Sequence, residues 1–469
     1  MRRQREVWLL LFVFAILSLG YWVVWQAYLP AWQALYPGQT WRVFTALPVT
    51  LVAWLLLSLA LVRRRCRETL LLPAAALLTG IGLLFLQRLA GGISLLAMQS
   101  GFDLTHIGQI AAQKGAPALA KTTALLLRCS DKQPISFLVG WVALMCVVLF
   151  WKDYRTLARY KYLIAIGATL LLLITTFFGS THGGQTIALD LGFFTFQPHD
   201  PVKLLLVIFM AAYLVENRQL LAIAGGRFGL LTLMDIRYLG PLLTMWLLMM
   251  AIIFKHDDLG AALLLFGALL GMLYLGTGRK AYVALGIVLS VAGVFVGYRV
   301  AKMAHLDFVN RIDTRIAIWL HPWSYTDNGS YQIVQALMAL GNGRVVGAGL
   351  AGGYPERVPA IHTDMIFSAI SEDLGLVGAV AVIGLFLFLI GRIYRVALQS
   401  AHRFGQLLAA GLATTLALQT WVILAGTMKF IPLTGITLPF ISYGGTSLVV
   451  NLVLLGIVLK IAEAPPSAG

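Results

Sequence analysis

The sequence predicts an all-α polytopic membrane protein. Of its 469 residues, 59% are hydrophobic and only 12% are charged, and the mean hydropathy is +0.85. This composition lies far from that of a soluble domain. Apolar runs of about 20 residues, long enough to cross about 30 Å of hydrocarbon as helices, recur between short polar breaks. We therefore expect about twelve transmembrane helices.

The expected spans follow one another along the whole chain. They cover residues 8–29, 43–62, 69–90, 135–151, 162–178, 202–216, 238–254, 259–277, 281–300, 364–391, 407–428 and 444–462. The fourth and sixth runs are short enough that one of them could be a re-entrant segment. Two long loops remain, 91–134 and 301–363, and the tail 464–469, with two prolines, is expected to be disordered.

Basic residues set the expected orientation, because short loops rich in Lys and Arg stay in the cytoplasm. One cluster precedes the first span and another follows the second, which predicts cytoplasmic termini and long loops outside; the clusters are Arg2, Arg3 and Arg5, then Arg63, Arg64, Arg65 and Arg67. The net charge of +16 is spread over many loops. We therefore expect contact with anionic membrane lipids and no nucleic-acid binding.

Neither a cleaved leader nor a disulfide is expected. The first apolar stretch runs from Val7 to Tyr28 without a small-residue cleavage site, so it should remain as an anchor. Cys66 should be cytoplasmic, Cys129 outside and Cys146 within the membrane. No two cysteines share a side, which predicts neither a bridge nor a thiolate metal site.

The loop 301–363 is the richer of the two long loops. It contains an expected amphipathic helix at Tyr331–Leu340, followed by Gly341, Gly343, Gly347 and Gly349. Glycines in such a loop usually form a flexible turn, and phosphate binding is the alternative. Asp364 follows where the chain enters the next apolar helix, and a carboxylate there is poorly hydrated without a partner or a task. It could cap that helix or act in catalysis.

Five ordered stretches carry a family resemblance. They read QPHDPVK from Gln197, HDDLGAALL from His256, GSYQIVQALMALGNGRVVGAGL from Gly329, HTDMIFSAISEDLGLVG from His362 and TGITLPFISYGGTSLVVN from Thr434. They resemble the SEDS family (shape, elongation, division and sporulation), typified by FtsW and RodA. Its corresponding motifs are QP-S-E-x-x-K, P-D-L-G-T-A-L, G-Y-Q-x-x-Q-S, H-T-D-F-I-F…E-E-L-G-x-x-G and P-L-I-S-Y-G-G-S-S.

The resemblance covers roughly residues 69–463 and implies a domain division. Family members typically have ten spans with a large functional loop between the seventh and eighth. If 1–68 is an added two-helix hairpin, loop 301–363 falls at that place in the core 69–463. The chain departs from the motifs at three positions, where Asp200 replaces Glu, His199 replaces Ser and Ala261 replaces Thr. Loop 91–134 is also unusually long.

The family resemblance implies a peptidoglycan glycosyltransferase that polymerises lipid II at the outer face of the bacterial cytoplasmic membrane. A carboxylate at that edge is the natural general base, and Asp364 is the candidate. Cations should meet the pyrophosphate leaving group, and the candidates are Arg311, Arg315, Arg344, Arg357 and Lys203. Further substrate contacts are expected from Asp200, Gln332, Gln335, His362 and Ser442. The expected partner is a class B penicillin-binding protein, a single-pass transpeptidase.

Several side chains have structural alternatives. Lys203 and Asp200 share a helix face and could form only an ion pair. His256, Asp257 and Asp258 favour a solvated helix cap over a metal site, and Mg²⁺ or Mn²⁺ stays open as a cofactor. Glu372 and Asp373 favour structural pairing, and the stretch 442–447 favours close helix packing over headgroup contact.

Two other function classes compete with the enzyme. A flippase for the same lipid would use Lys203, Asp200 and Glu372 along a polar path, and a scaffold would recruit a cell-wall synthase without chemistry. The outward position of the candidate residues favours the enzyme. A flippase should have comparable numbers of polar residues in the cytoplasmic half of its helices.

Overall fold

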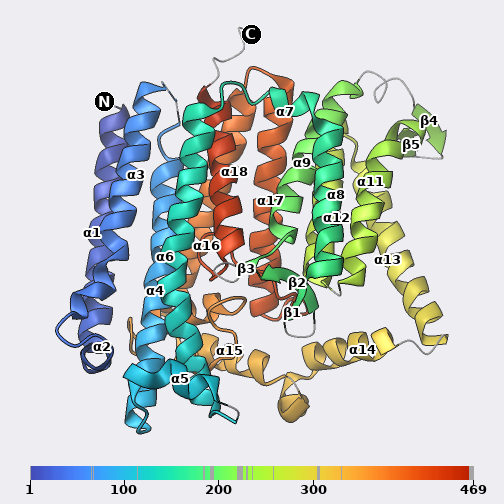
Figure 1. Cartoon of the computed structure of the whole chain (residues 1–469). Coiled ribbons are helices and arrows are strands. Elements are labelled where there is room, and N and C mark those ends of the chain that lie inside the picture. The colour runs from blue at the N-terminus through green and yellow to red at the C-terminus, as the bar shows by residue number, and fades with distance from the viewer. Residues whose placement is uncertain are drawn as a thin grey trace.

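The computed structural model is a bundle of roughly parallel helices with irregular structure at one end (Figure 1). The structure describes residues 2–64, 66, 68–113, 115–182, 185–190, 195–218, 225–228, 231–234, 236–256, 258–303, 307–328 and 330–463. The expected disordered tail 464–469 lies outside these residues. Both termini lie at the same end of the bundle (Figure 1).

Each predicted span coincides with a helix. These helices are α1 (Arg2–Ala27), α3 (Ala46–Arg63), α4 (Leu71–Gln99), α6 (Ala118–Phe150), α8 (Lys161–Phe178), α9 (His199–Glu216), α11 (Ile236–Lys255), α12 (Leu259–Thr277), α13 (Lys280–Met303), α16 (Ile366–Gln399), α17 (Arg403–Thr427) and α18 (Gly445–Glu463). Within the described residues, nine helices are long and apolar enough to cross a membrane, and α11 and α13 contain shorter apolar stretches. The polytopic helical architecture is confirmed, while the count of about twelve spans remains a prediction.

The prediction of a loop over 91–134 is wrong. Helix α4 continues to Gln99 and α6 already begins at Ala118, so only a short connection with η2 (Leu104–His106) and α5 (Ile107–Ala112) separates them. Hydropathy marks where a helix leaves hydrocarbon, and a helix whose polar turns reach water does not have to end there. Pro134 lies inside α6 without ending it. Both short apolar runs lie in continuous helices, α6 and α9.

Strands occur only in loops of the described chain, and the sequence did not indicate them. The strands β1 (Ser180–His182), β2 (Gln185–Asp190) and β3 (Thr195–Phe196) form one antiparallel sheet, in which Leu189 pairs with Phe196. A second hairpin pairs β4 (Gly225–Phe228) with β5 (Leu231–Met234). The remaining short helices are α2 (Leu29–Leu35), η1 (Thr40–Phe44), α7 (Thr156–Arg159), α14 (Asp307–Leu320), η3 (Pro322–Asn328), α15 (Tyr331–Asn342) and η4 (Pro355–Arg357).

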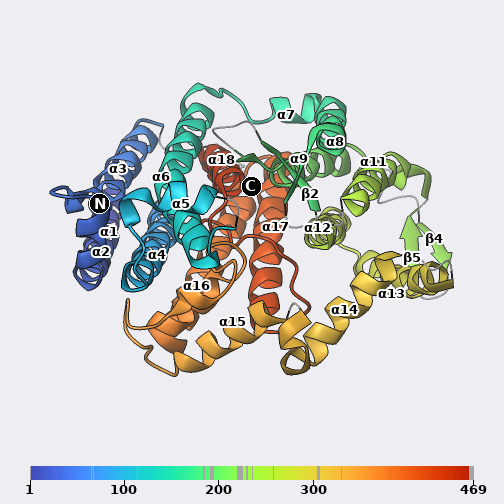
Figure 2. The same ribbon diagram turned by 60° about the horizontal axis from the view of Figure 1, so that its bottom comes forward.

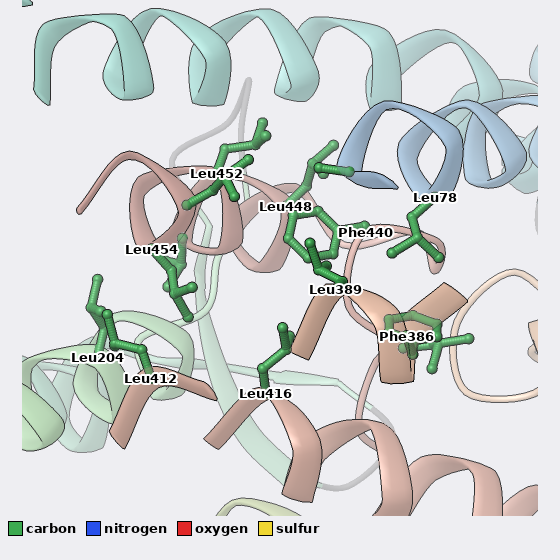
Figure 3. Packing of buried hydrophobic residues seen from close by; sticks show 14 of the residues in the cluster. Leu78, Leu204, Phe386, Leu389, Leu412, Leu416, Phe440, Leu448, Leu452 and Leu454 are labelled. Carbon is green, nitrogen blue, oxygen red and sulfur yellow. The ribbon is translucent and has the colours of Figure 1, made fainter. Parts of the chain in front are cut away.

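The core lies where α4, α9, α16, α17 and α18 meet. Phe386 and Leu389 of α16, Leu416 of α17 and Leu448 of α18 converge with Phe440 of the loop before α18 (Figure 3). At the end opposite the termini, α14 and α15 run across the bundle, and α15 lies beside α16 and α17 (Figures 1 and 2). The loop that leads from α15 to α16 therefore closes this end.

Helix α16 is broken near its start, at Gly375, whose φ is +67°. The glycine-containing loop after α15 fills the break. The carbonyls of Glu372 and Asp373 accept hydrogen bonds from the N–H groups of Ala348 (2.9 Å) and Gly349 (3.0 Å). In return, the N–H groups of Leu376 and Val377 donate to the carbonyls of Arg344 (3.0 Å) and Val345 (3.1 Å), respectively. All four backbone groups are thus hydrogen-bonded within the protein, although the helix is broken at this point.

The glycines of this loop therefore serve close packing against α16. A Cβ added at Gly343 would lie 1.9 Å from the carbonyl oxygen of Ser371, and one at Gly347 would lie 2.2 Å from that of Asp373. Neither a flexible turn nor a phosphate cradle describes the segment, because its backbone is held by the helix that it repairs.

We predict that Gly347→Ala destabilises the protein more than Gly349→Ala. Both glycines have a positive φ, +93° and +94°, so both variants carry about 1–2 kcal/mol of backbone strain. Only Gly347 also faces a clash, which adds about 1–3 kcal/mol, because nothing lies within 4 Å of a Cβ at Gly349. Thermal unfolding midpoints of the detergent-purified proteins measure the difference. Equal losses would show that backbone strain alone explains these glycines.

Candidate active site

Asp364 lies in the loop two residues before the start of α16. The residue is 9% exposed, and its carboxylate accepts hydrogen bonds from the Thr363 hydroxyl (2.9 Å) and the Gln332 amide (3.3 Å). Burial raises the pKa of the Asp364 carboxyl above its ordinary value, and these hydrogen bonds only partly oppose the rise. The N-cap residue of α16 is Met365, and no side chain caps the helix. Asp364 therefore does not act as the helix cap, and its carboxylate remains available for chemistry.

The stretch before α18 fixes the backbone around Asp364. Ser442 is buried, and its hydroxyl donates to the carbonyl of Thr363 while accepting from the N–H of Leu438 (2.9 Å). The N–H of Tyr443 donates to the carbonyl of His362 (2.8 Å). From α17, the Thr427 hydroxyl lies 3.3 Å from the carbonyl oxygen of Asp364 and 2.9 Å from that of Ile423, and its single proton is shared between them. Ser442 was expected to touch substrate, but its hydroxyl is already used to position the residue before Asp364.

The other polar residues near Asp364 are uncharged. Burial lowers the pKa of His362 to about 4, so its imidazole is neutral at neutral pH and cannot supply a charge to phosphate. Its ring centroid lies 5.9 Å from that of Tyr443. Gln335 lies one helical turn after Gln332 on the same face of α15. The immediate surroundings of the carboxylate thus offer amide, hydroxyl and aromatic groups.

Lys203 and Asp200 form a second buried group on α9. The ammonium lies 2.7 Å from the Asp200 carboxylate and donates to the side-chain oxygen of Gln419 at 2.7 Å. Gln419 in turn donates to the carbonyl of Thr437 (2.9 Å). A small cavity beside Lys203 is also lined by Thr415, Gln419 and Asn451, among apolar side chains. The predicted ion pair is confirmed.

This group is near Asp364 but does not touch it. Gln419 and Thr427, which anchor the two groups, lie on α17 eight residues apart, which corresponds to about 12 Å along a helix. Lys203 and Asp200 therefore lie deeper in the bundle than the Asp364 carboxylate.

The predicted loop cations do not gather at Asp364. Arg315, Arg344 and Arg357 are exposed, and the Arg357 guanidinium lies 4.8 Å from the centre of the Tyr354 ring. The side chain of Arg311 falls outside the described part of the chain. Within that part, no hydrogen bond or ion pair joins the exposed three to the Asp364 loop. The positive charges of these three arginines are explained by their exposure to solvent.

Arg88, for which no role was predicted from the sequence, makes several polar contacts at this end of the bundle. Arg88 is fully buried in α4 and makes ion pairs with Asp373 (2.7 Å) and Glu356 (2.6 Å). It also donates to the carbonyl of Gly353 (2.6 Å), and the ring of Tyr28 covers it at 5.8 Å. An arginine inside an apolar run was the available signal, since intramembrane charges need partners. The preference for pairing at Asp373 is confirmed.

The acidic residue next to Asp373 is held differently. Glu372 accepts a hydrogen bond from the N–H of Tyr354 (3.2 Å). It therefore pairs with the backbone of the same loop that Arg88 fastens through Glu356 and Gly353.

The predicted helix cap is present at Asp258, but the expectation that it is solvated is wrong, because Asp258 and His256 are buried. Asp258 accepts a hydrogen bond from the N–H of Ala261 (2.9 Å) at the start of α12. Its carboxylate also lies 2.8 Å from Nδ1 of His199, whose other ring nitrogen is 3.2 Å from His256. Asp257 lies outside the described residues, and within them no three His, Cys, Asp or Glu side chains are grouped to hold a metal.

These features define a class of protein, a multi-pass membrane protein that presents a buried carboxylate at one end of its helix bundle. A family model described as cell cycle protein, FtsW/RodA/SpoVE, matches residues 117–465. The chain belongs to this family, which is the SEDS family of the sequence motifs.

Curated relatives and solved structures agree with this membership. Over 399 residues the chain is 37% identical to the peptidoglycan glycosyltransferase RodA of Mycobacterium tuberculosis, covering 84% of this chain and 78% of the relative. Over 335 residues it is 32% identical to the probable peptidoglycan glycosyltransferase FtsW of Geobacter metallireducens, covering 71% and 84%.

Two solved structures share the fold. A protein from a peptidoglycan synthase complex that coordinates polymerization and crosslinking matches with a TM-score of 0.58 at 24% identity, covering 81% of this chain and 96% of that one. A variant of the Thermus thermophilus rod shape determining protein RodA matches with a TM-score of 0.52 at 22% identity, covering 84% and 96%.

We predict that Lys203→Ala and Asp200→Ala each lower polymerisation by about tenfold or more, because each leaves a buried charge without its partner. The double variant should be no worse than the more damaging single variant, as expected for a coupled pair. Initial rates on labelled lipid II, at equal folded concentrations, test this. Fully additive losses would mean that the two side chains act separately.

Proposed function

We propose that the chain is a peptidoglycan glycosyltransferase that polymerises lipid II, with Asp364 as general base. The buried carboxylate, fixed by backbone contacts on both sides and raised in pKa, is the observation that carries the proposal. The curated relatives bear the name peptidoglycan glycosyltransferase, which supports the reaction class. No nucleotide-sugar donor is required, because the sugar is activated by its own pyrophosphate.

The reaction needs one proton acceptor and one stabilised leaving group. The acceptor sugar hydroxyl loses its proton to the Asp364 carboxylate while its oxygen attacks the anomeric carbon of the donor. The bond from that carbon to the pyrophosphate oxygen breaks, and its electron pair leaves with the polyprenyl pyrophosphate. Gln332 and Thr363 orient the carboxylate, and a base of raised pKa holds the proton more firmly than an exposed aspartate.

The orientation and setting belong to the same proposal. The working end, opposite the termini, faces outward from the bacterial cytoplasmic membrane, and both termini are cytoplasmic. Arginine clusters at the start of α1 and from the end of α3 onward support this orientation. A class B penicillin-binding protein is the proposed partner, in line with the similar chain of a complex that couples polymerization and crosslinking.

The enzyme accounts for the polar residues better than a flippase does. The flippase alternative joins Lys203, Asp200 and Glu372 into one path. In the structure they belong to two separate groups. Lys203 and Asp200 form one group, in which Lys203 also donates to Gln419. Glu372 instead accepts a hydrogen bond from the loop that Arg88 contacts at Gly353.

We predict that Asp364→Asn lowers lipid II polymerisation by about 100-fold or more while leaving expression and the thermal midpoint unchanged, because the amide keeps the size but cannot accept a proton. Asp103→Asn, at an exposed carboxylate outside this site, is the matched control and should keep full activity. In the unchanged protein, activity should fall as the pH drops through the raised pKa of Asp364. Half or more of the activity in Asp364→Asn would remove it from the role of base.

The division into a hairpin, 1–68, and a core, 69–463, is also part of the proposal. We assign partner docking or membrane placement to the hairpin. It packs on α4 through small residues, with Leu17 against Gly80 and Tyr28 against Gly91. Lipid tails can replace such apolar contacts, because they are as apolar as the side chains that they would cover.

We predict that a chain that begins at Glu68, with an insertion signal, still polymerises lipid II. Removing an even number of spans preserves the orientation of all later helices, and the Glu68–Arg392 ion pair (2.7 Å) is kept. Polymerisation by shortened and full-length proteins is compared at equal folded concentration. A well-folded shortened protein that is inactive even with its partner would place the hairpin in the catalytic unit.

A further inference from the structure

The first half of α6 borders the Asp364 loop. Gln133 is buried and donates to the carbonyl of Ser442 (3.2 Å), while its side-chain oxygen accepts from the N–H of Gly444 (3.3 Å). Ser442 holds Thr363, the neighbour of Asp364. Helix α6 is therefore joined to the site through one intervening segment.

Two cations precede Gln133 on this helix. Lys132 is its direct neighbour, and Arg128 lies one turn earlier on the same face as Lys132. Arg128 is exposed and Lys132 is half-buried. All charged residues of α6 lie before Pro134, and the sixteen residues from Ile135 to Phe150 carry none. The basic pair thus lies where the helix leaves the hydrocarbon.

Neither cation is neutralised by the neighbouring acid. Asp131 is three residues after Arg128 and next to Lys132, but it forms no ion pair with either; its charge, second to burial, raises the pKa of Tyr36 in the N-terminal hairpin. Arg128 and Lys132 make no ion pair with any carboxylate of the described residues. They are a pair of positive charges without a negative counterpart.

The pair is within electrostatic reach of the site. Burial raises the pKa of Tyr443 to about 12, and the positive charge of Arg128 opposes this rise. Tyr443 shares a hydrogen bond with the Cys129 thiol and packs near His362. Cys129, the residue next to Arg128, thus contacts the aromatic side chain of the segment that packs on the Asp364 loop.

The other described cations of this end are either bound by the protein or, like Arg315, Arg344 and Arg357, exposed without a bond to the Asp364 loop. Arg88 is bound by Asp373 and Glu356, and Lys203 by Asp200 and Gln419. Lys429 donates to the carbonyl of Leu320. Among the described residues, Arg128 and Lys132 are the two cations of α6 that lie near the segment packed on the Asp364 loop and form no ion pair.

We propose that Arg128 and Lys132 form the subsite that binds the pyrophosphate of a polyprenyl-linked sugar. The ligand carries two adjacent phosphoryl groups at the membrane surface, and two cations one turn apart on a helix match that charge. Charge-assisted hydrogen bonds to phosphate oxygens are strong, and they strengthen as negative charge develops on the leaving group. The sugar identity rests on the proposed function, but recognition of the pyrophosphate does not.

Binding is measured on the full-length Asp364→Asn protein in neutral detergent, with labelled polyprenyl pyrophosphate as the probe. Adding R128Q and K132Q together should weaken binding by about tenfold or more, because two charge-assisted contacts are lost. K121Q is the matched control, since Lys121 is exposed on the same helix but two turns further from the site, and it should change binding less than about twofold. R128K with K132R should retain binding, and thermal midpoints confirm equal folding.

Unchanged binding in the double variant would overturn the proposal, and so would an equal loss in K121Q, which would indicate general attraction to basic surface. Phosphatidylglycerol serves as a competitor. If it displaces the probe as well as unlabelled polyprenyl pyrophosphate does, the pair is an anionic headgroup site instead.

An activity measurement separates this proposal from the proposed function. In the protein with Asp364 intact, the double variant should raise the KM for lipid II and weaken inhibition by polyprenyl pyrophosphate, each by about tenfold. If the unaltered protein makes no polymer, the proposed function fails, and the binding measurement still decides the subsite.

Discussion

Hydrocarbon offers no hydrogen bonds, and this constraint explains how the working end of the protein is built. Helix α16 could not break at Gly375 inside an apolar bundle unless another segment supplied the missing partners. The loop of residues 344–349 does so from both sides of the break. Because the same loop continues to Asp364, repairing the helix and placing the carboxylate are parts of one arrangement.

Arg88 secures this arrangement electrostatically. A fully buried guanidinium is costly unless its donors are satisfied, and here two carboxylates and a carbonyl satisfy them. The partners come from η4, the residue Gly353 and α16, so α4 ties the segment that follows the break-filling loop to α16. Tyr28 adds an aromatic face from the N-terminal hairpin. The value of such a buried network lies in specifying one geometry rather than in large net stability.

Much of the fold could be predicted from hydropathy, because membrane spans must be long and apolar. Asp364 was also predictable, since a carboxylate at the edge of an apolar helix needs a task. Hydropathy could not show that α6 begins at Ala118, because water permits a helix as readily as a loop. Nor could it separate Gly347 from Gly349, whose difference is one contact with α16. Arg88 carried a signal, but its partners lie 268 and 285 residues away along the chain.

The anchoring of Asp364 by Ser442, Tyr443 and Thr427 has a consequence for biosynthesis. A ribosome delivers Asp364 to the membrane well before it delivers the residues that hold its backbone. Until α17 and the segment before α18 have been inserted, the carboxylate lacks the contacts that bury and orient it. A nascent or prematurely terminated chain thus has the aspartate without its environment. Under the proposed role of Asp364, polymer synthesis can begin only after nearly the whole chain has been translated.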